Sequence, residues 1–379
     1  MPGDTALVST ATSTLALDVG GRTRPLLFDA LPALARDVPW RPLAKLPTPV
    51  ERIGSDAAKW LGRDDLWIKR DDLASPLYGG NKVRRYELVL AEAERRGAKR
   101  IVTAGGVAST QVMATALFGR ALGFEVRVVL YDQPITRFAK HALLVDADTG
   151  AELIWGGNYL TTAVRTIDAL LRDRRENFLI LPGASDPLAN LGYIDAMLEL
   201  AQQVERGECP RPDAIVLPTG SSGTLAALAL GAAWLGWDTE LVGVRIAPLL
   251  TTNRLTIGGV IAATDRFLEA RDPERWKRQR GRARFSLHHG AIGPGYGHPT
   301  PAAIDAIDHV RAIIGAEGEV TYSGKALDGL RAIAAEPRWR GKNVMLWSTL
   351  SAARPAPSPH AREKLPPRLR ALLDAPEVA

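Results

Sequence analysis

Short runs of β-branched and other apolar residues alternate with longer helical patterns along most of the chain. Strands are expected at residues 66–70, 100–103, 126–131, 152–155, 214–217, 241–245 and 343–347. Helical patterns lie between them, at residues 83–95, 107–122, 136–149 and 161–174 and in a segment that ends at residue 235. Short strands separated by helices predict parallel sheets with right-handed crossovers, so the expected fold class is α/β.

The composition argues against several classes of protein. No apolar run reaches the length of about 18 residues that a membrane helix needs, and the first residues lack the features of a secretory signal. The one cysteine, Cys209, excludes an internal disulfide and fits a reducing cytoplasm. The six histidines lack the paired spacing of metal ligands on a helix, so no metal is expected.

The net charge of +6 comes partly from residues 275–284 and from a tail that starts at residue 352. The tail contributes Arg354, Arg362, Lys364, Arg368 and Arg370, which fall among prolines. No basic stripe interleaved with aromatic residues accompanies them. The excess charge therefore predicts solvated surface and no nucleic-acid partner.

The stretch Gly79-Gly80-Asn81-Lys82 lies between a predicted strand and a predicted helix. A lysine acts as a nucleophile only when its pKa, about 10.4 in water, is lowered or when the amine is already held as a Schiff base. Glycines let the backbone approach a flat ligand, and asparagine adds hydrogen bonds. Lys82 is thus a candidate reactive amine, and the alternative is an exposed lysine on a glycine turn.

A second candidate site is the loop at residues 218–224, which also joins a predicted strand to a helix. Its Gly, Ser and Thr residues present N–H groups and hydroxyls to an anion, and the helix N-terminus adds positive potential. The loop matches neither a triphosphate-binding P-loop nor the dinucleotide fingerprint, so a single phosphate monoester fits best. An ordinary capped helix start is the alternative. A reactive lysine and a separate phosphate cup together indicate pyridoxal phosphate.

Further motifs follow in a fixed order between residues 40 and 350. They are Leu46-Pro47-Thr48-Pro49, Trp67-Ile68-Lys69-Arg70-Asp71-Asp72, Gly79-Gly80-Asn81-Lys82-Val83-Arg84, Thr103-Ala104-Gly105-Gly106-Val107, Leu181-Pro182-Gly183, Leu191-Gly192-Tyr193, the loop at Gly220, Gly295-Tyr296-Gly297 and Tyr322-Ser323-Gly324-Lys325-Ala326. In this order the chain resembles the enzymes that include D-cysteine desulfhydrase and 1-aminocyclopropane-1-carboxylate deaminase. These enzymes use pyridoxal 5'-phosphate and share the tryptophan-synthase-β-like fold, also called fold type II.

The resemblance implies how the cofactor is held. Lys82 would form the Schiff base, and Asn81 would support the ring. The implied phosphate contacts are Thr219, Gly220, Ser221, Ser222, Gly223 and Thr224. Thr110, Ser323 and Thr349 complete the implied cofactor contacts.

The resemblance also implies which residues meet the substrate, a small amino acid. Ser109 would contact its carboxylate or move protons, with Thr110 and Gln111 beside it. Tyr296 and Tyr322 match two active-site tyrosines. Taken alone, Ser109 is better explained as a helix cap, and the tyrosines are better explained by core packing.

The alternation and the resemblance together imply two open, twisted parallel-sheet domains with the cofactor between them. The smaller domain is expected at residues 85–194, inserted into a larger one formed by residues 42–84 and 195–351. Residues 1–41 form an extension that is irregular except for an amphipathic segment at about 31–36, and residues 352–379 form a Pro- and Arg-rich tail. A homodimer is expected by analogy with relatives.

The chain departs from the family pattern at several positions near the substrate. Thr110 stands where an asparagine usually bonds the cofactor's phenolic oxygen, and Met113 replaces a usual arginine. A His-Thr-Gly-Gly turn is replaced by Ser348-Thr349-Leu350-Ser351, and leucine is a poor replacement for glycine where φ must be positive. A rebuilt substrate pocket is therefore expected.

Ser323 favours one reaction over another. The deaminase that opens a cyclopropane ring has a glutamate after its tyrosine, whereas the desulfhydrase has a threonine, which Ser323 resembles. A neutral hydroxyl leaves the pyridine nitrogen protonated less often than a carboxylate does. The expected reaction is therefore β-elimination that releases a keto acid and ammonia, or β-replacement. Ring opening is the alternative.

Two rival functions remain open at this point. A protein that binds pyridoxal phosphate with altered or no catalysis is suggested by the losses at Thr110 and at Leu350-Ser351. A nucleotide-dependent Rossmann enzyme is suggested by the α/β alternation, but the chain lacks an acidic residue after a matching glycine fingerprint.

Overall fold

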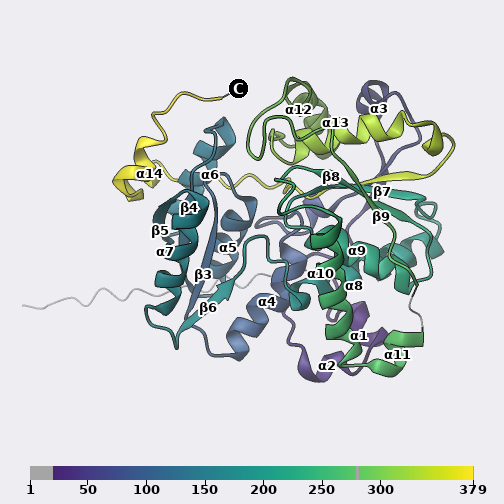
Figure 1. Ribbon diagram of the computed structural model, residues 1–379, viewed down its shortest axis with the longest axis horizontal. Coiled ribbons are helices and arrows are strands. Elements are labelled where there is room, and N and C mark those ends of the chain that lie inside the picture. The colour runs from purple at the N-terminus through teal and green to yellow at the C-terminus, as the bar shows by residue number, and fades with distance from the viewer. Residues whose placement is uncertain (1–19, 279–280, 379) are drawn as a thin grey trace, which may run out of the picture.

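The computed structural model describes residues 20–278 and 281–378, which contain two β-sheets (Figure 1). The six-stranded sheet has the order β1 (Val50–Arg52), β2 (Trp67–Lys69), β10 (Val344–Trp347), β7 (Ala214–Thr219), β8 (Glu240–Arg245) and β9 (Phe285–His288). The four-stranded sheet has the order β5 (Glu152–Gly157), β4 (Glu125–Tyr131), β3 (Arg100–Gly106) and β6 (Asn177–Ile180). Neighbouring strands run parallel except β1 and β2, which are antiparallel.

Helices cover both sheets. They are α1 (Leu26–Ala30), α2 (Leu34–Asp37), α3 (Ser55–Leu61), α4 (Val83–Arg95), α5 (Thr110–Ala121), α6 (Arg137–Asp148), α7 (Tyr159–Leu171), α8 (Pro187–Glu205), α9 (Gly223–Trp234), α10 (Arg254–Glu269), α11 (Pro273–Arg278), α12 (Pro301–Ile314), α13 (Ser323–Ala334) and α14 (Pro367–Ala371). Short 3-10 helices lie at Asp71–Leu73, Pro337–Trp339 and Ala361–Lys364. None of the helices in the described ranges is long and apolar enough to cross a membrane.

Strand β7 shows why the six-stranded sheet is buried on both faces. Its side chains alternate, so that Ile215 and Leu217 join the core beneath α8 and α9. Ala214 and Val216 join a second core beneath α12 and α13. A parallel strand covered by helices on both sides reads as a continuous apolar run, which is how the segment could be recognised from sequence.

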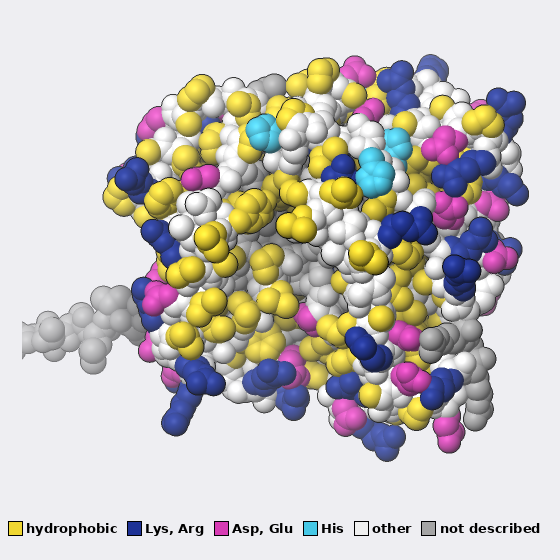
Figure 2. All heavy atoms as spheres, viewed as in Figure 1, with side chains coloured by type: hydrophobic (Ala, Val, Ile, Leu, Met, Phe, Trp, Pro, Cys, Tyr) yellow, Lys and Arg dark blue, Asp and Glu magenta, His cyan; other side chains and the backbone are white. Residues whose placement is uncertain are grey.

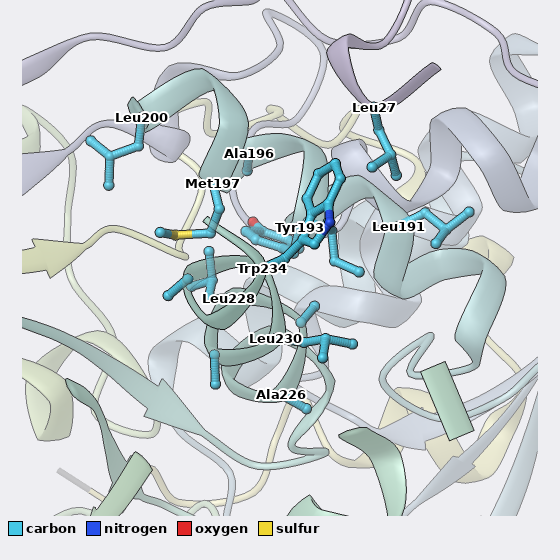
Figure 3. Close-up of a cluster of buried hydrophobic side chains, with 14 of the residues drawn as sticks. Leu27, Leu191, Tyr193, Ala196, Met197, Leu200, Ala226, Leu228, Leu230 and Trp234 are labelled. Atoms are coloured by element: carbon cyan, nitrogen blue, oxygen red, sulfur yellow. The ribbon is translucent and has the colours of Figure 1, made fainter. Parts of the chain in front are cut away.

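Helices α8 and α9 form the centre of the first core (Figure 3). Tyr193 and Met197 of α8 lie against Leu228 and Trp234 of α9. On another side of α8, a Cβ on Gly192 would lie 2.2 Å from the carbonyl oxygen of Arg84, so only glycine lets α8 approach α4 this closely. This contact fixes the helix that begins next to Lys82.

The predicted elements are mostly present, with different ends. The helix predicted at residues 83–95 is confirmed as α4. The strand predicted at 100–103 extends to Gly106, and the helix predicted from 107 begins at Thr110, because Ser109 caps it. The elements that were not predicted are strands β1, β6 and β9 and helices α1, α3, α8, α10, α11, α12, α13 and α14. The four-stranded sheet lies within the predicted small domain, whose boundaries stay a prediction.

The N-terminal extension is more ordered than expected where it is described. It forms α1 and α2, and Arg22 pairs with Asp195 and Glu199 of α8. Residues 1–19 lie outside the described residues. The extension therefore packs on the core that contains α8.

The basic side chains Arg362, Lys364 and Arg368 of the tail are exposed, in line with the predicted solvated charge, but the tail also packs against the protein. After β10, the chain crosses to the four-stranded sheet, where α14 lies beside α6 and β4 (Figure 1). Leu365 and Leu369 are fully buried there, because an amphipathic segment can bury apolar side chains among charged ones. Ser358 and Lys364 both bond Asp148 of α6. The tail thus joins the two sheets across the cleft.

A buried ionic cluster joins β2, α4 and α8. Glu199 accepts hydrogen bonds from Lys69 at 2.6 Å and from Arg84 at 2.8 Å. Arg84 also bonds Asp71, at 2.8 Å. Although burial alone would raise it, the pKa of Glu199 is lowered by the charges of Arg84 and Lys69. All four side chains are buried, and buried charges are tolerated only when they are paired.

We expect Arg84→Met to destabilise the protein by about 3–5 kcal/mol, because Asp71 and Glu199 would keep buried charges with fewer partners. The free energy of unfolding in urea measures this. Arg95→Met is the matched control on the same helix, since Arg95 pairs with Glu92 while its own side chain is 59% exposed, and little change is expected there. Equal effects of the two substitutions would contradict the importance of the cluster.

Glu87 of α4 gives a pH-dependent contribution to stability. Burial raises its pKa to about 7, although its carboxylate accepts hydrogen bonds from the N–H groups of Leu43 and Ala44. Because this pKa is higher in the folded state, the protonated form of Glu87 stabilises the protein. The contribution is complete below the unfolded value near 4.5 and is lost as pH rises through about 7.

Glu87→Gln keeps an acceptor for these N–H groups and cannot ionise. We expect the free energy of unfolding of the variant to exceed that of the wild type at pH 8, and the difference to shrink toward pH 5. Urea titrations of both proteins at several pH values measure this difference. A difference that does not change with pH would contradict the assignment.

Candidate functional site

The turn at Gly79–Lys82 is held by the segment that follows β10. The N–H of Asn81 donates to the carbonyl of Thr349 at 3.0 Å, and that of Gly79 donates to the hydroxyl of Ser351 at 2.8 Å. Gly80 has φ of +80°, and a Cβ there would lie 2.4 Å from the Thr349 oxygen. Glycine is therefore required at this position.

These contacts explain part of the departure from the family pattern. The sequence raised the concern that Leu350 stands where φ must be positive. Leu350 does not have a positive φ, and its side chain is buried in the core beneath α13. Ser351 supplies the hydroxyl that Gly79 uses. The segment Ser348–Ser351 therefore supports the turn before Lys82 through Thr349 and Ser351.

Lys82 lies directly before the first turn of α4 and is almost fully buried. Burial lowers the pKa of its amine well below the ordinary value, and the neighbouring charge of Arg85 lowers this pKa further. Within the described parts of the chain, Lys82 has no acidic partner that would hold its proton. A neutral amine is the form that attacks a carbonyl carbon.

The loop between β7 and α9 forms a cup. Ser222 lies immediately before α9 with φ of +67°, and its buried hydroxyl has no hydrogen-bond partner in the described structure. The loop stands at a carboxyl strand end and at the N-terminus of a long apolar helix, whose free N–H groups favour an anion. The unpartnered hydroxyl is the feature that an anion with oxygen acceptors would complete.

Arg85 joins the cup to the turn, although the sequence gave no signal for this residue beyond its place after Lys82. Its guanidinium donates to Thr224 at 2.9 Å and to the carbonyls of Gly183 and Ala184. Asn81 also donates to Thr224, at 3.2 Å. Arg85 is fully buried and lacks a carboxylate partner among the described residues, so its positive charge adds to the potential near the cup.

A cavity of about 660 Å³ opens between these elements. Most predicted site residues line it: Asn81 and Lys82, Ser109 and Gln111, the loop from Thr219 to Ser222 with Thr224, and the tyrosines Tyr296 and Tyr322. Four predicted residues do not line its wall. Thr110 and Gly223 lie just beside it, and Ser323 and Thr349 line a small neighbouring hollow that shares Pro218 with it.

The helix that begins at Thr110 presents its N-terminus to the cavity. Ser109 caps it, with its hydroxyl accepting from the N–H of Val112 at 3.3 Å. The amide of Gln111 donates to Thr103 and Thr115, so this group is held by the protein rather than free. Ser109 thus combines the cap suggested by the sequence with a place on the cavity wall.

Tyr296 and Tyr322 meet at one side of the cavity. Their hydroxyl oxygens lie 2.9 Å apart, and burial raises the pKa of both, so both are protonated near neutral pH. Glu319 accepts from the N–H groups of Tyr322 and Ser323 and so fixes the start of α13.

Lys325 belongs to the motif at residues 322–326, and the sequence indicated no role for it. It is buried and donates to the carbonyls of Ile292 and Gly295, which holds the loop that carries Tyr296. Two further tyrosines, Tyr131 and Tyr159, also line the cavity, and Tyr131 interacts with both Tyr159 and Tyr296. The sequence analysis did not find them, because nothing local in the sequence distinguishes them.

A larger hollow of about 790 Å³ lies elsewhere, beside the amino ends of β8 and β9. Its wall includes Glu240, Arg254 and Phe285. In parallel sheets, ligands bind at the carboxyl ends of the strands. This hollow lies at the amino ends, so it is not the candidate site although it is larger. The smaller cavity contains the perturbed lysine and the cup.

Comparison with known proteins decides the family. The model of the family described as pyridoxal-phosphate-dependent enzyme matches residues 42–349. The chain belongs to this family. It is 31% identical over 322 residues to a D-cysteine desulfhydrase from Salmonella newport, an alignment that covers 79% of this chain and 90% of the relative. A D-cysteine desulfhydrase from Salmonella typhimurium is 32% identical over the same length.

Solved structures agree with this assignment. A homologue of 1-aminocyclopropane-1-carboxylate deaminase has a TM-score of 0.70 and 26% identity, covering 90% of this chain and 98% of its own. A serine racemase from Dictyostelium discoideum shares the fold, with a TM-score of 0.55 and 17% identity, covering 86% of this chain and 96% of its own. The predicted fold class, two parallel-sheet α/β units of the tryptophan-synthase-β type, is confirmed.

The residues present fit pyridoxal phosphate. The unpartnered Ser222 hydroxyl and the start of α9 suit its phosphate, and the amine of Lys82, whose pKa is lowered, suits its aldehyde from the wall of the same cavity. The hydroxyl of Ser323 bonds the backbone of Glu319, so the predicted contact of Ser323 with the ring stays a prediction, as does that of Thr349.

We expect Ser222→Gly to weaken binding of pyridoxal phosphate by about 10- to 100-fold, because a hydrogen bond to a charged oxygen is lost. The free energy of unfolding of the cofactor-free protein should not fall, since glycine accepts a positive φ and the hydroxyl lacks a partner. Absorbance titration and urea unfolding measure the two quantities.

Ser75→Ala is the control for this substitution. The Ser75 hydroxyl is also buried without a partner in the described structure, but Ser75 lies off the cavity wall. Cofactor affinity should stay unchanged. If Ser222→Gly also left the affinity for pyridoxal phosphate unchanged, Ser222 would not be a phosphate contact.

Proposed function

We propose that this enzyme eliminates a leaving group from Cβ of an amino acid and releases a keto acid and ammonia. The observation that carries the proposal is the buried amine of Lys82, whose pKa is lowered by burial, on the wall of a cavity that also holds the cup and a tyrosine pair. The relatives named as D-cysteine desulfhydrases support this type of reaction.

The cofactor supplies an aldehyde for the substrate amine and a ring that takes up electrons from Cα. Lys82 would be the base that removes the Cα proton, because burial lowers the pKa of its amine. Ser109 and the first N–H groups of α5 orient the substrate carboxylate at a helix N-terminus.

The tyrosine pair acts at the leaving group. Tyr296 and Tyr322 keep their protons because their pKa values are raised. One hydroxyl can donate a proton to the leaving group while the other hydroxyl, 2.9 Å away, stabilises the phenolate oxygen that this donation leaves. Elimination needs this proton at the departing atom. Ser323 is neutral, whereas a carboxylate at this position would favour ring opening, so Ser323 supports elimination. The alternatives to elimination are β-replacement and ring opening. A homodimer in the cytoplasm stays a prediction.

We expect Lys82→Ala to lose the visible absorbance band that the lysine-bound cofactor gives. Borohydride treatment of the wild type should attach the reduced cofactor to Lys82, detected by peptide mass spectrometry. Lys59→Ala, at an exposed lysine, should keep the band. A wild type without the band, and with Lys82 unmodified after reduction, would refute the proposal.

Product analysis separates the alternatives. The holoenzyme is incubated with D-cysteine, L-cysteine and 1-aminocyclopropane-1-carboxylate. Sulfide and pyruvate indicate elimination, whereas 2-oxobutanoate from the cyclopropane substrate indicates ring opening. A visible band without any product from a wider set of β-substituted amino acids would indicate a binding protein.

A further inference from the structure

The cavity wall contains one cationic side chain, Lys82, and no carboxylate among the described residues. The remaining polar groups on the wall are hydroxyls, amides and backbone groups. Arg85, the nearest other cation, is engaged by Thr224 and by the carbonyls of Gly183 and Ala184. A charged substrate side chain would therefore lose its hydration without gaining a partner of opposite charge.

Two tyrosines enter the cavity from the four-stranded sheet. Tyr131 ends β4, and Tyr159 begins α7 directly after β5, so both stand at the carboxyl ends of neighbouring strands. Their ring centroids lie 4.4 Å apart with the planes tilted by 36°. Gly106 makes room for this pair, because a Cβ there would lie 3.0 Å from the Tyr131 ring.

The mouth of the cavity is apolar on the other side as well. Pro248 and Leu250, from the loop after β8, line it, and Leu250 is 87% exposed. Tyr159 is 60% exposed. Figure 2 shows a hollow between the side of the molecule that carries α7 and the side that carries α10, with hydrophobic side chains around it. Exposed apolar groups beside a cavity mark a binding surface.

We propose that the substrate carries a neutral aromatic or bulky apolar group on its leaving atom, and that Tyr131, Tyr159 and Leu250 bind this group. The inference rests on the proposed elimination and names its substrate class. An aromatic ring against the tyrosine pair gains the favourable geometry of offset or edge-to-face contacts, and it covers Leu250 from water. The carboxylate end stays at Ser109, deeper in the cavity.

The reaction balances without an added oxidant or reductant. In a thioether substrate, the Cα–H and Cβ–S bonds break, and the sulfur takes a proton and leaves as a thiol. The remaining carbon unit takes up one water and becomes pyruvate and ammonium. Tyr131 and Tyr159 bind the departing group beside Tyr296, which lies next to Tyr131.

The test compares S-benzylcysteine, S-methylcysteine and S-carboxymethylcysteine, each as both enantiomers, with the holoenzyme. We expect kcat/KM to be highest for the benzyl compound and lowest for the charged one. Tyr159→Ala and Leu250→Ala should each lower the benzyl-to-methyl ratio, by about tenfold for Tyr159. KM should account for most of this change, because the contact lies away from the reacting atoms.

Two neighbours provide matched controls. Leu160 adjoins Tyr159 and Leu249 adjoins Leu250, and both are exposed leucines that do not line the cavity. Leu160→Ala and Leu249→Ala should leave the benzyl-to-methyl ratio unchanged. A fall in the ratio with these controls as large as with Tyr159→Ala would overturn the assignment of the two mouth residues.

A binding measurement keeps the inference testable if turnover is absent. Phenylalanine and alanine have no leaving group on Cβ, and their binding is followed by the visible spectrum of the holoenzyme. Phenylalanine should bind more tightly, and Tyr159→Ala should remove most of the difference. Equal or tighter binding of alanine, or preference for S-methylcysteine, would overturn the inference while leaving the proposed function intact. Failure to form a holoenzyme would overturn both.

Discussion

The pairing of Asp71 and Glu199 with Arg84 is the interaction on which the rest of the structure depends. Asp71 also accepts hydrogen bonds from Tyr193 of α8 and from the indole N–H of Trp347 at the end of β10. The Asp71 carboxylate thus joins the segment after β2 to α4, to α8 and to strand β10. Because an unpaired buried charge is so unfavourable, these elements have few alternative arrangements.

The same arrangement sets the electrostatics of Lys82. Arg84 points to the buried carboxylates, while Arg85, one residue later on the helix, reaches the cup at Thr224. Asp71 and Glu199 are therefore paired with Arg84. Lys82 instead has Arg85 as its charged neighbour and lines a cavity without carboxylates among the described residues. A lysine beside a free carboxylate would keep its proton. Burial and the charge of Arg85, without an acidic partner for Lys82 among the described residues, therefore lower the pKa of its amine.

Both sheets contribute to the wall of the cavity, and they meet where Tyr131 lies next to Tyr296. The side from the six-stranded sheet carries the cup, the lysine and the Tyr296–Tyr322 pair, which suit the cofactor and the proton transfers. The side from the four-stranded sheet carries Ser109 and the Tyr131–Tyr159 pair, which suit the substrate. The C-terminal tail ties these sides together, since it leaves β10 and buries Leu365 and Leu369 beside α6.

The sequence by itself determined the α/β alternation and the family, and it singled out Lys82 and the loop at residues 218–224 as candidate site residues. Each depends on a short pattern that local backbone chemistry explains, such as apolar periodicity or a glycine turn before a helix. Only the tertiary structure decided the partners of Arg84 and Arg85, the tyrosines of the cavity mouth and the packing of the tail. The bond between Asp71 and Trp347 spans 276 residues. Local patterns carry no information about which distant segments meet, because burial and charge pairing are satisfied only in the assembled fold.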